Sequence, residues 1–127
     1  MVKKYIFNTI GFSYMALMVF GSLINMSETL ILDLAFQDKL IHFTAFAILC
    51  FVIFFLFVIN KIKNSLKKAI TAAIIFGIVI EILQVKLTYY RAFEFYDIAA
   101  NTAGILTMGQ IIRLKKPFIV KKLESLM

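Results

Sequence analysis

The chain has 127 residues, of which 62% are hydrophobic and 17% are charged, with a formal net charge of +7. Soluble domains typically have about 45–50% apolar and about 25% charged residues, so this composition excludes a water-soluble globule and a disordered chain. The length suits one domain over residues 1–127. The single cysteine, Cys50, excludes an intrachain disulfide, and because it lies in an apolar run we interpret it as a small buried or lipid-facing hydrophobe.

Four stretches of the sequence are long and apolar enough to span a membrane as helices, which takes about 20 residues. The first, residues 5–24, follows Lys3 and Lys4. It also fits a secretory signal peptide, but its apolar run is longer than usual and no small-residue cleavage site follows, so we interpret it as a span. The second, residues 40–59, is the most apolar, and Phe54 within it is expected to face lipid.

The third and fourth stretches carry more polar residues. They cover residues 69–87, with Glu81, Gln84 and Lys86, and residues 95–112, with Asp97, Asn101 and Gln110. Unbroken apolar runs lack the alternation of a membrane barrel, and only helices or closed barrels satisfy their backbone in lipid. The sequence therefore predicts an all-α, multi-pass membrane protein with four transmembrane helices in one bundle.

Basic residues indicate how this bundle is oriented. They gather before the first stretch, between the second and third, and after the fourth, whereas nearly all acidic residues fall on the other side. Because cytoplasmic loops carry the excess of Lys and Arg, both termini are predicted to be cytoplasmic. This topology accounts for the net charge, so no nucleic-acid partner is expected. The basic tail, residues 113–127, either lies along anionic lipid headgroups or is solvated.

Polar side chains recur at helical spacing in the last three stretches, all in the outer half of the predicted bundle. A charged residue at the centre of a membrane helix costs about 2.5–3.5 kcal/mol on insertion scales, so such groups usually face the bundle interior. Three stripes that meet there would form an outward-facing polar pocket, which small residues on the last helix allow to pack closely. The stripes are Asp38 with His42; Gly77, Glu81, Gln84 and Thr88; and Asp97, Asn101, Gly104 and Met108.

Each of these residues also has a structural interpretation. Asp38 would be the N-cap of its helix, and Lys39 would extend to the membrane interface. His42, near a helix end, is more commonly a structural hydrogen-bonding group than a ligand. Glu81 is the hardest to explain structurally, because a buried carboxylate needs a partner such as Arg91 or Lys39.

Three further residues are open to two interpretations. Gln84 and Asn101 suit hydrogen bonds between helices as well as they suit a ligand. Arg91, in the predicted outer loop, suits an ion pair with Asp97 or Glu94, or an anionic ligand.

Taken in order, these residues resemble a known family. The pattern is Asp38-Lys39-x-x-His42, then Glu81-x-x-Gln84, then Arg91-x(5)-Asp97-x(3)-Asn101-x(2)-Gly104. It is similar to the VanZ-like family of small bacterial membrane proteins, whose named member is associated with resistance to the glycopeptide teicoplanin. The resemblance covers residues 37–109 and implies a place in the bacterial cytoplasmic membrane, with these nine residues as signature positions.

The sequence departs from the family pattern at two places. Tyr89-Tyr90 precedes Arg91 where the family often has a Pro-Gly turn, and Ala92 follows it where a small hydroxyl residue is common. Met108 stands where the family has a second glycine, and Gly109 comes one position later. These differences affect the shape of the loop and the packing of the last helix.

Several functions fit these features. In the first, the pocket binds or processes an envelope component such as a lipid-linked cell-wall precursor and so alters glycopeptide susceptibility. Arg91 and Lys39 would engage its phosphate or carboxylate. The pocket would be lined by Asp38, His42, Glu81, Gln84, Asp97 and Asn101.

In the second, the protein is a membrane-embedded enzyme in which Glu81 is the general acid or base and His42 its partner, with Asp97 as a further catalytic candidate. A divalent metal held by His42, Glu81 and Asp97 is a possible cofactor of that enzyme. An ion-coupled carrier and a purely structural bundle complete the alternatives. The sequence leaves an oligomer open.

Overall fold

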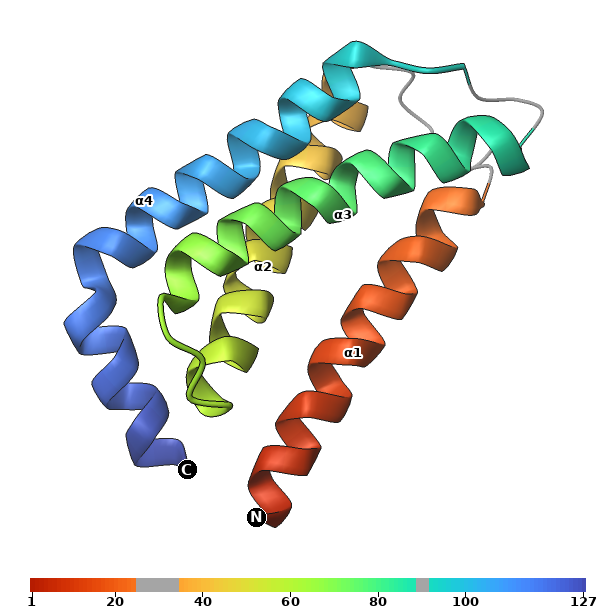
Figure 1. The fold of residues 1–127 in the computed structure, drawn as a ribbon. Coiled ribbons are helices and arrows are strands. Elements are labelled where there is room, and N and C mark those ends of the chain that lie inside the picture. Colours follow the sequence, from red (N-terminus) through yellow and green to blue (C-terminus); the bar gives the residue numbers. More distant parts are fainter. Residues whose placement is uncertain (25–34, 89–91) are drawn as a thin grey trace.

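The computed structural model describes residues 1–24, 35–88 and 92–127, which form four helices. They are α1 (Val2–Leu23), α2 (Ala35–Ile59), α3 (Ser65–Leu87) and α4 (Phe95–Leu126). Successive helices run in opposite directions, and both termini lie at the same end of the molecule (Figure 1). The predicted all-α class is confirmed.

A tight turn reverses the chain between α2 and α3. Lys61 lies in the left-handed region with φ 57°, and its N–H donates to the Val58 carbonyl at 3.0 Å. The Ile62 N–H donates to the Phe57 carbonyl at 2.9 Å. These two bonds satisfy carbonyls that a helix end leaves open, in the pattern of a Schellman motif. The motif ends α2 and sends α3 back antiparallel to it.

Within the described residues, three helices are long and apolar enough to cross a membrane: Val2–Leu23, Gln37–Ile59 and Ser65–Leu87. α4 does not meet the same criterion, because Asp97 and Asn101 interrupt its apolar part. The helix also continues to Leu126, well past residue 112, where the sequence predicted the end of a span and the start of a tail. Pro117 lies inside this extension, and α4 changes direction in its C-terminal part (Figure 1).

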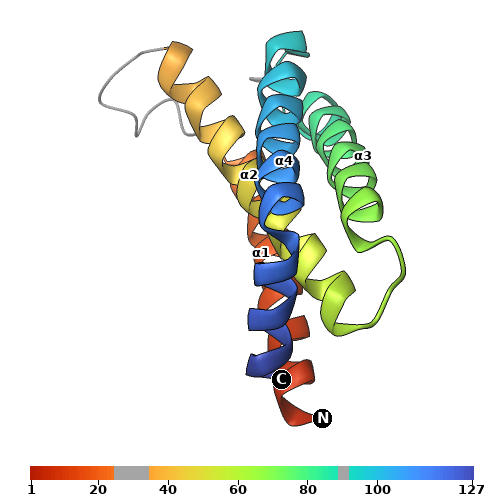
Figure 2. The same cartoon turned by 90° about the vertical axis from the view of Figure 1, so that its left-hand side faces the viewer.

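The core forms where α4 packs on α2 and α3 (Figure 2). The backbones of α4 and α2 come very near each other at Gly104, where an added Cβ would overlap the backbone carbonyl of Phe43. Only glycine lets the two backbones come so near. Phe54 is fully buried rather than lipid-facing as predicted, and Cys50 is a core residue. The buried apolar cluster comprises Phe46, Leu49, Cys50, Ile53, Phe54, Ala69, Ala73, Ile80, Ile105 and Ile112.

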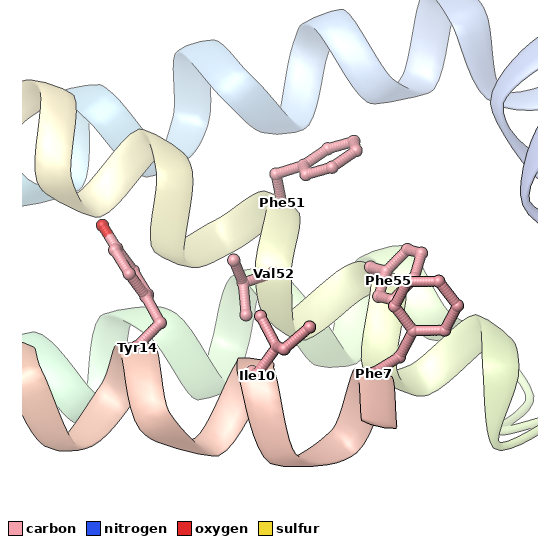
Figure 3. A pocket seen from close by; sticks show the side chains of 7 residues that line it. Phe7, Ile10, Tyr14, Phe51, Val52 and Phe55 are labelled. Carbon is pink, nitrogen blue, oxygen red and sulfur yellow. The ribbon is translucent and has the colours of Figure 1, made fainter. Parts of the chain in front are cut away.

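α1 lies against α2 and α3 and is mostly exposed, with only Gly11 buried. Hydrogen bonds fasten it at three levels: Asn60 Nδ2 to Asn8 Oδ1 at 2.9 Å, Tyr14 Oη to the Ala45 carbonyl at 2.9 Å, and Gln84 Nε2 to the Ser22 carbonyl at 2.8 Å. An apolar cavity of about 250 Å³ lies between part of α1 and part of α2 (Figure 3). It is lined by Phe7, Ile10, Gly11, Tyr14, Phe51, Val52 and Phe55.

Candidate functional site

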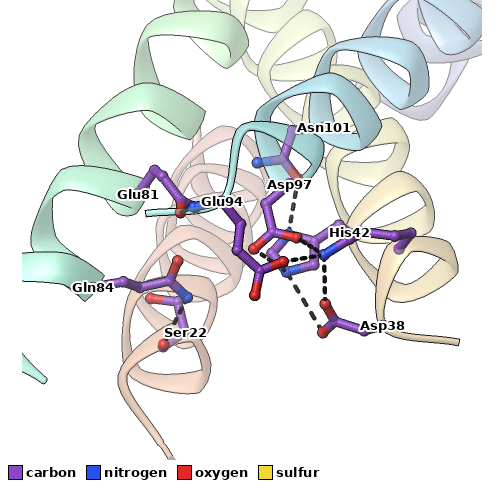
Figure 4. Close-up of polar contacts among 9 residues, drawn as sticks. Ser22, Asp38, His42, Glu81, Gln84, Glu94, Asp97 and Asn101 are labelled. Carbon is purple, nitrogen blue, oxygen red and sulfur yellow. Dashed lines mark hydrogen bonds and ion pairs between the residues drawn. The ribbon is translucent and has the colours of Figure 1, made fainter. Parts of the chain in front are cut away.

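Charged side chains converge where α2 and α4 begin, at the end of the bundle opposite the termini. The Lys39 ammonium contacts Asp38 Oδ2 at 3.0 Å, Glu94 Oε2 at 2.6 Å, and Asp97 Oδ1. Asp97 is buried with a side-chain exposure of 1%, whereas Glu94 is 49% exposed. The ion pairs therefore run from the bundle interior to its surface. We call Asp38, Lys39, His42, Glu94, Asp97 and Asn101 the polar cluster (Figure 4).

His42 connects the two helices inside this cluster. Its Nδ1 lies 3.0 Å from Asn101 Oδ1, which is a hydrogen-bond distance. Its Nε2 lies 3.8 Å from both Asp38 Oδ1 and Asp97 Oδ2, which is too long for a hydrogen bond. Asp38, His42 and Asp97 each have one atom of a kind that can bind a metal ion, and these three atoms lie within 4.8 Å of one another.

Helical spacing explains why these residues meet. Asp38 and His42 are four positions apart on α2, as Asp97 and Asn101 are on α4, so each pair lies on one helix face. The contact between Gly104 and Phe43 holds the two faces together. α2 already begins at Ala35, so Asp38 lies in the first turn and the predicted N-cap role is wrong.

Two buried polar residues of α3 lie at the same end of the bundle and bond to the neighbouring helices. Glu81, 1% exposed, accepts the backbone N–H of Glu94 at 3.1 Å through Oε1. Glu94 is the N-cap of α4, so Glu81 satisfies one of the backbone donors near the start of that helix. The Gln84 side chain, also 1% exposed, donates to the Ser22 carbonyl at the end of α1. The Thr88 hydroxyl donates to the backbone carbonyl of Gln84.

The structure thus brings five predicted site residues into contact with one another. A sixth, Glu81, is connected to them through Glu94, which contacts both Glu81 and Lys39. Gln84 lies nearby but bonds to α1 instead. Arg91 and the Tyr89-Tyr90 pair before it lie outside the described residues. Among the described residues, the group at metal-ligand distance contains Asp38 in place of the predicted Glu81. The five are Asp38, Lys39, His42, Asp97 and Asn101.

The sequence analysis did not identify Glu94 as a partner of Lys39. Glu94 lies outside any apolar stretch, three positions before Asp97. Its spacing from Asp97 only weakly indicates that the two side chains lie together. Residues three apart share a helix face only if both are helical, and Glu94 is the N-cap of α4.

These features define an all-helical membrane protein with an ionisable cluster held between helices at one end. A family model described as VanZ/LLP1 matches residues 2–116, which is nearly the whole chain, and the chain belongs to this family. The predicted resemblance is confirmed, and the match also includes α1, which the signature residues do not reach. A search of curated proteins and a search of solved structures each found no match.

Proposed function

We propose that the protein crosses the bacterial cytoplasmic membrane four times, with both termini inside. Its polar cluster then faces outward and binds the polar head of an envelope component such as a lipid-linked cell-wall precursor. Binding of that component alters susceptibility to glycopeptides such as teicoplanin. The observation that carries this proposal is the contact among five signature residues at the end of the bundle opposite the termini: Asp38, Lys39, His42, Asp97 and Asn101.

The distribution of charge supports the orientation. Lys3 and Lys4 lie in the first turn of α1, at the end of the molecule that holds both termini. The connection between α2 and α3 is also rich in lysine. The ion pairs of Asp38, Glu94 and Asp97 lie at the opposite end. An excess of Lys and Arg marks the cytoplasmic side of a membrane protein.

Buried polar atoms near the cluster support ligand binding. Asn101 Nδ2 and Gln84 Oε1 are buried and have no hydrogen-bond partner within the described part of the chain. Leaving such a group unsatisfied costs about 1–3 kcal/mol, so a hydroxyl or amide of a ligand, or a water molecule, would relieve the cost. Lys39 is 26% exposed, so the ion pairs of the cluster are reachable from solvent.

The enzyme hypothesis gains less support from the geometry. Glu81 uses one carboxylate oxygen to accept a backbone N–H, and His42 uses one ring nitrogen to contact Asn101. Both contacts hold helices in place. These contacts fit a binding protein, which needs the two residues fixed in place.

Two experiments test the proposal. In a Cys50→Ala background, Thr88→Cys at the end of α3 should label from outside with an impermeant thiol reagent, and Ser65→Cys at its start should not. The purified protein in nanodiscs should bind a lipid-linked precursor, and Asn101→Ala should weaken binding, while Ile75→Leu on an exposed apolar face should not. Reversed labelling, or equal binding by both variants, would contradict the proposal.

A further inference from the structure

We propose that Asp38, His42 and Asp97 form a binding site for a divalent transition-metal ion, which competes with the Lys39 ammonium for the same two carboxylates. The site uses residues of the polar cluster, but it does not depend on which envelope component the protein binds. It replaces Glu81, the ligand expected from the sequence, with Asp38.

The spacing of the ligand atoms suits one ion. His42 Nε2 lies 3.8 Å from a carboxylate oxygen of Asp38 and 3.8 Å from one of Asp97. Zinc binds imidazole nitrogen and carboxylate oxygen at about 2.0–2.2 Å, so two of its ligand atoms lie at most about 4 Å apart. An ion between the three residues therefore needs only small side-chain rotations, without movement of either helix.

The hydrogen bond on the other side of the imidazole orients it for a metal. Nδ1 faces Asn101 Oδ1 at 3.0 Å, and an amide oxygen can only accept, so Nδ1 carries the proton. In the neutral ring, Nε2 then directs its lone pair at two carboxylates. Metal-binding histidines characteristically donate their other N–H to such an acceptor. Asn101 is 2% exposed, so the orientation is fixed from within the bundle.

The charges around Lys39 also favour binding of a divalent cation. Three carboxylates, those of Asp38, Glu94 and Asp97, contact this one ammonium, so their combined negative charge exceeds its positive charge. Lys39 contacts Asp38 and Asp97 through the carboxylate oxygens that do not face His42, so it competes with the ion for the charge of these two groups. Displacement needs only rotation of its flexible side chain toward solvent, because Lys39 is already 26% exposed.

The donor set selects the class of ion. One imidazole with two carboxylates suits Zn²⁺, Fe²⁺ or Mn²⁺ better than Mg²⁺ or Ca²⁺, which favour oxygen ligands alone. Three protein ligands leave a coordination position open for water or for a ligand oxygen. Asp38 is 34% exposed, so that position is reachable from solvent.

The test measures metal binding to the purified full-length protein, prepared with an affinity tag that contains no histidine. His42 is the only histidine of the chain, so His42→Asn removes every imidazole. Titration calorimetry with Zn²⁺ and with Mn²⁺ should show saturable binding of one ion. Asn101→Ala should weaken it about 10–100-fold, the usual loss when a supporting hydrogen bond is removed. Lys39→Gln should strengthen it at least about tenfold, because the competing charge is gone.

A matched control and a second measurement keep the test independent of folding defects. Glu124→Gln removes an exposed carboxylate at the far end of α4 and should leave metal affinity unchanged. Paramagnetic resonance of Mn²⁺ bound to the unaltered protein should show coupling to a nitrogen nucleus. Absence of saturable binding in Lys39→Gln, or equal binding after His42→Asn, would overturn the proposal. Teicoplanin susceptibility is measured separately, so loss of the metal site and loss of the proposed function are distinguishable.

Discussion

Two helix contacts in this molecule both pass through a glycine, and they differ in what the glycine touches. At Gly104, between α4 and α2, an added Cβ would meet the backbone carbonyl of Phe43. At Gly11, between α1 and α2, it would meet the end of the Leu56 side chain at 2.8 Å. A side chain can change rotamer, whereas a helix backbone cannot move without repacking the core. The first contact is therefore rigid and the second adaptable.

Four of the signature residues lie near the rigid contact. Asp38, His42, Asp97 and Asn101 belong to α2 and α4, within two helical turns of Phe43 or Gly104. A site that depends on distances between side chains of two helices needs those helices held closely. In α1, only 6% of the apolar stretch is buried inside the structure, against 39% in α2, so α1 is instead suited to contact with lipid.

The largest effect is expected from Gly104→Ala. The added methyl group overlaps a backbone oxygen, and overpacking of this kind costs about 3 kcal/mol or more because α2 and α4 must separate. Protein level in the membrane and thermal stability in detergent should both fall sharply. Gly21→Ala is the matched control, because a Cβ there meets nothing within 4 Å. Equal stability of the two variants would show that the crossing is not rigid.

Asp97→Asn tests the ion pairs that the crossing holds in place. The change leaves Lys39 with two carboxylates instead of three and removes the buried one. We expect a loss of up to about 3 kcal/mol in unfolding free energy, since one partner of a largely buried pair is lost. Thermal melting in detergent measures it. A stability equal to that of the original protein would mean that solvent already screens the pair.

Glu81→Gln separates positioning from charge. The amide oxygen still accepts the Glu94 N–H, so the start of α4 should stay in place at a cost of about 1 kcal/mol. If the carboxylate also serves the proposed ligand, glycopeptide susceptibility should change although protein level does not. Loss of function only in proportion to loss of stability would make Glu81 purely structural.

Gly11→Ala should have the smallest effect. The Leu56 side chain can change rotamer, and alanine favours the helix by about 1 kcal/mol over glycine. We expect a change within about 1 kcal/mol of either sign in thermal unfolding, and unchanged susceptibility. A loss as large as that of Gly104→Ala would remove the distinction between the two contacts.

The sequence predicted the helices and much of the site because both depend on local spacing. Apolar runs marked the helices, and the four-residue spacing of Asp38 with His42 and of Asp97 with Asn101 marked the faces that meet. Phe54 was placed wrongly because apolar periodicity does not distinguish a lipid-facing side from a core-facing one when nearly every position is apolar.

Other features depend on contacts between distant segments. Asp38 was taken for a cap because the helix start could be read only from local signals. The partner Glu94 lies 55 positions from Lys39, and no pattern in one sequence reports such a pairing. The continuation of α4 through Pro117 was also missed, because proline usually ends a helix.

The separation of Lys39 from Asp97, 58 positions along the chain, sets an order for the assembly of this protein during its synthesis. The ion pair cannot form until the start of α4 has been translated, so α2 and α3 are synthesised before the buried carboxylate that completes their polar end. A chain truncated before Glu94 would carry Lys39 without its partners Glu94 and Asp97, and Glu81 without the Glu94 N–H. The start of α4 therefore completes the polar cluster, because it supplies the buried carboxylate that pairs with Lys39 and the backbone N–H that Glu81 accepts.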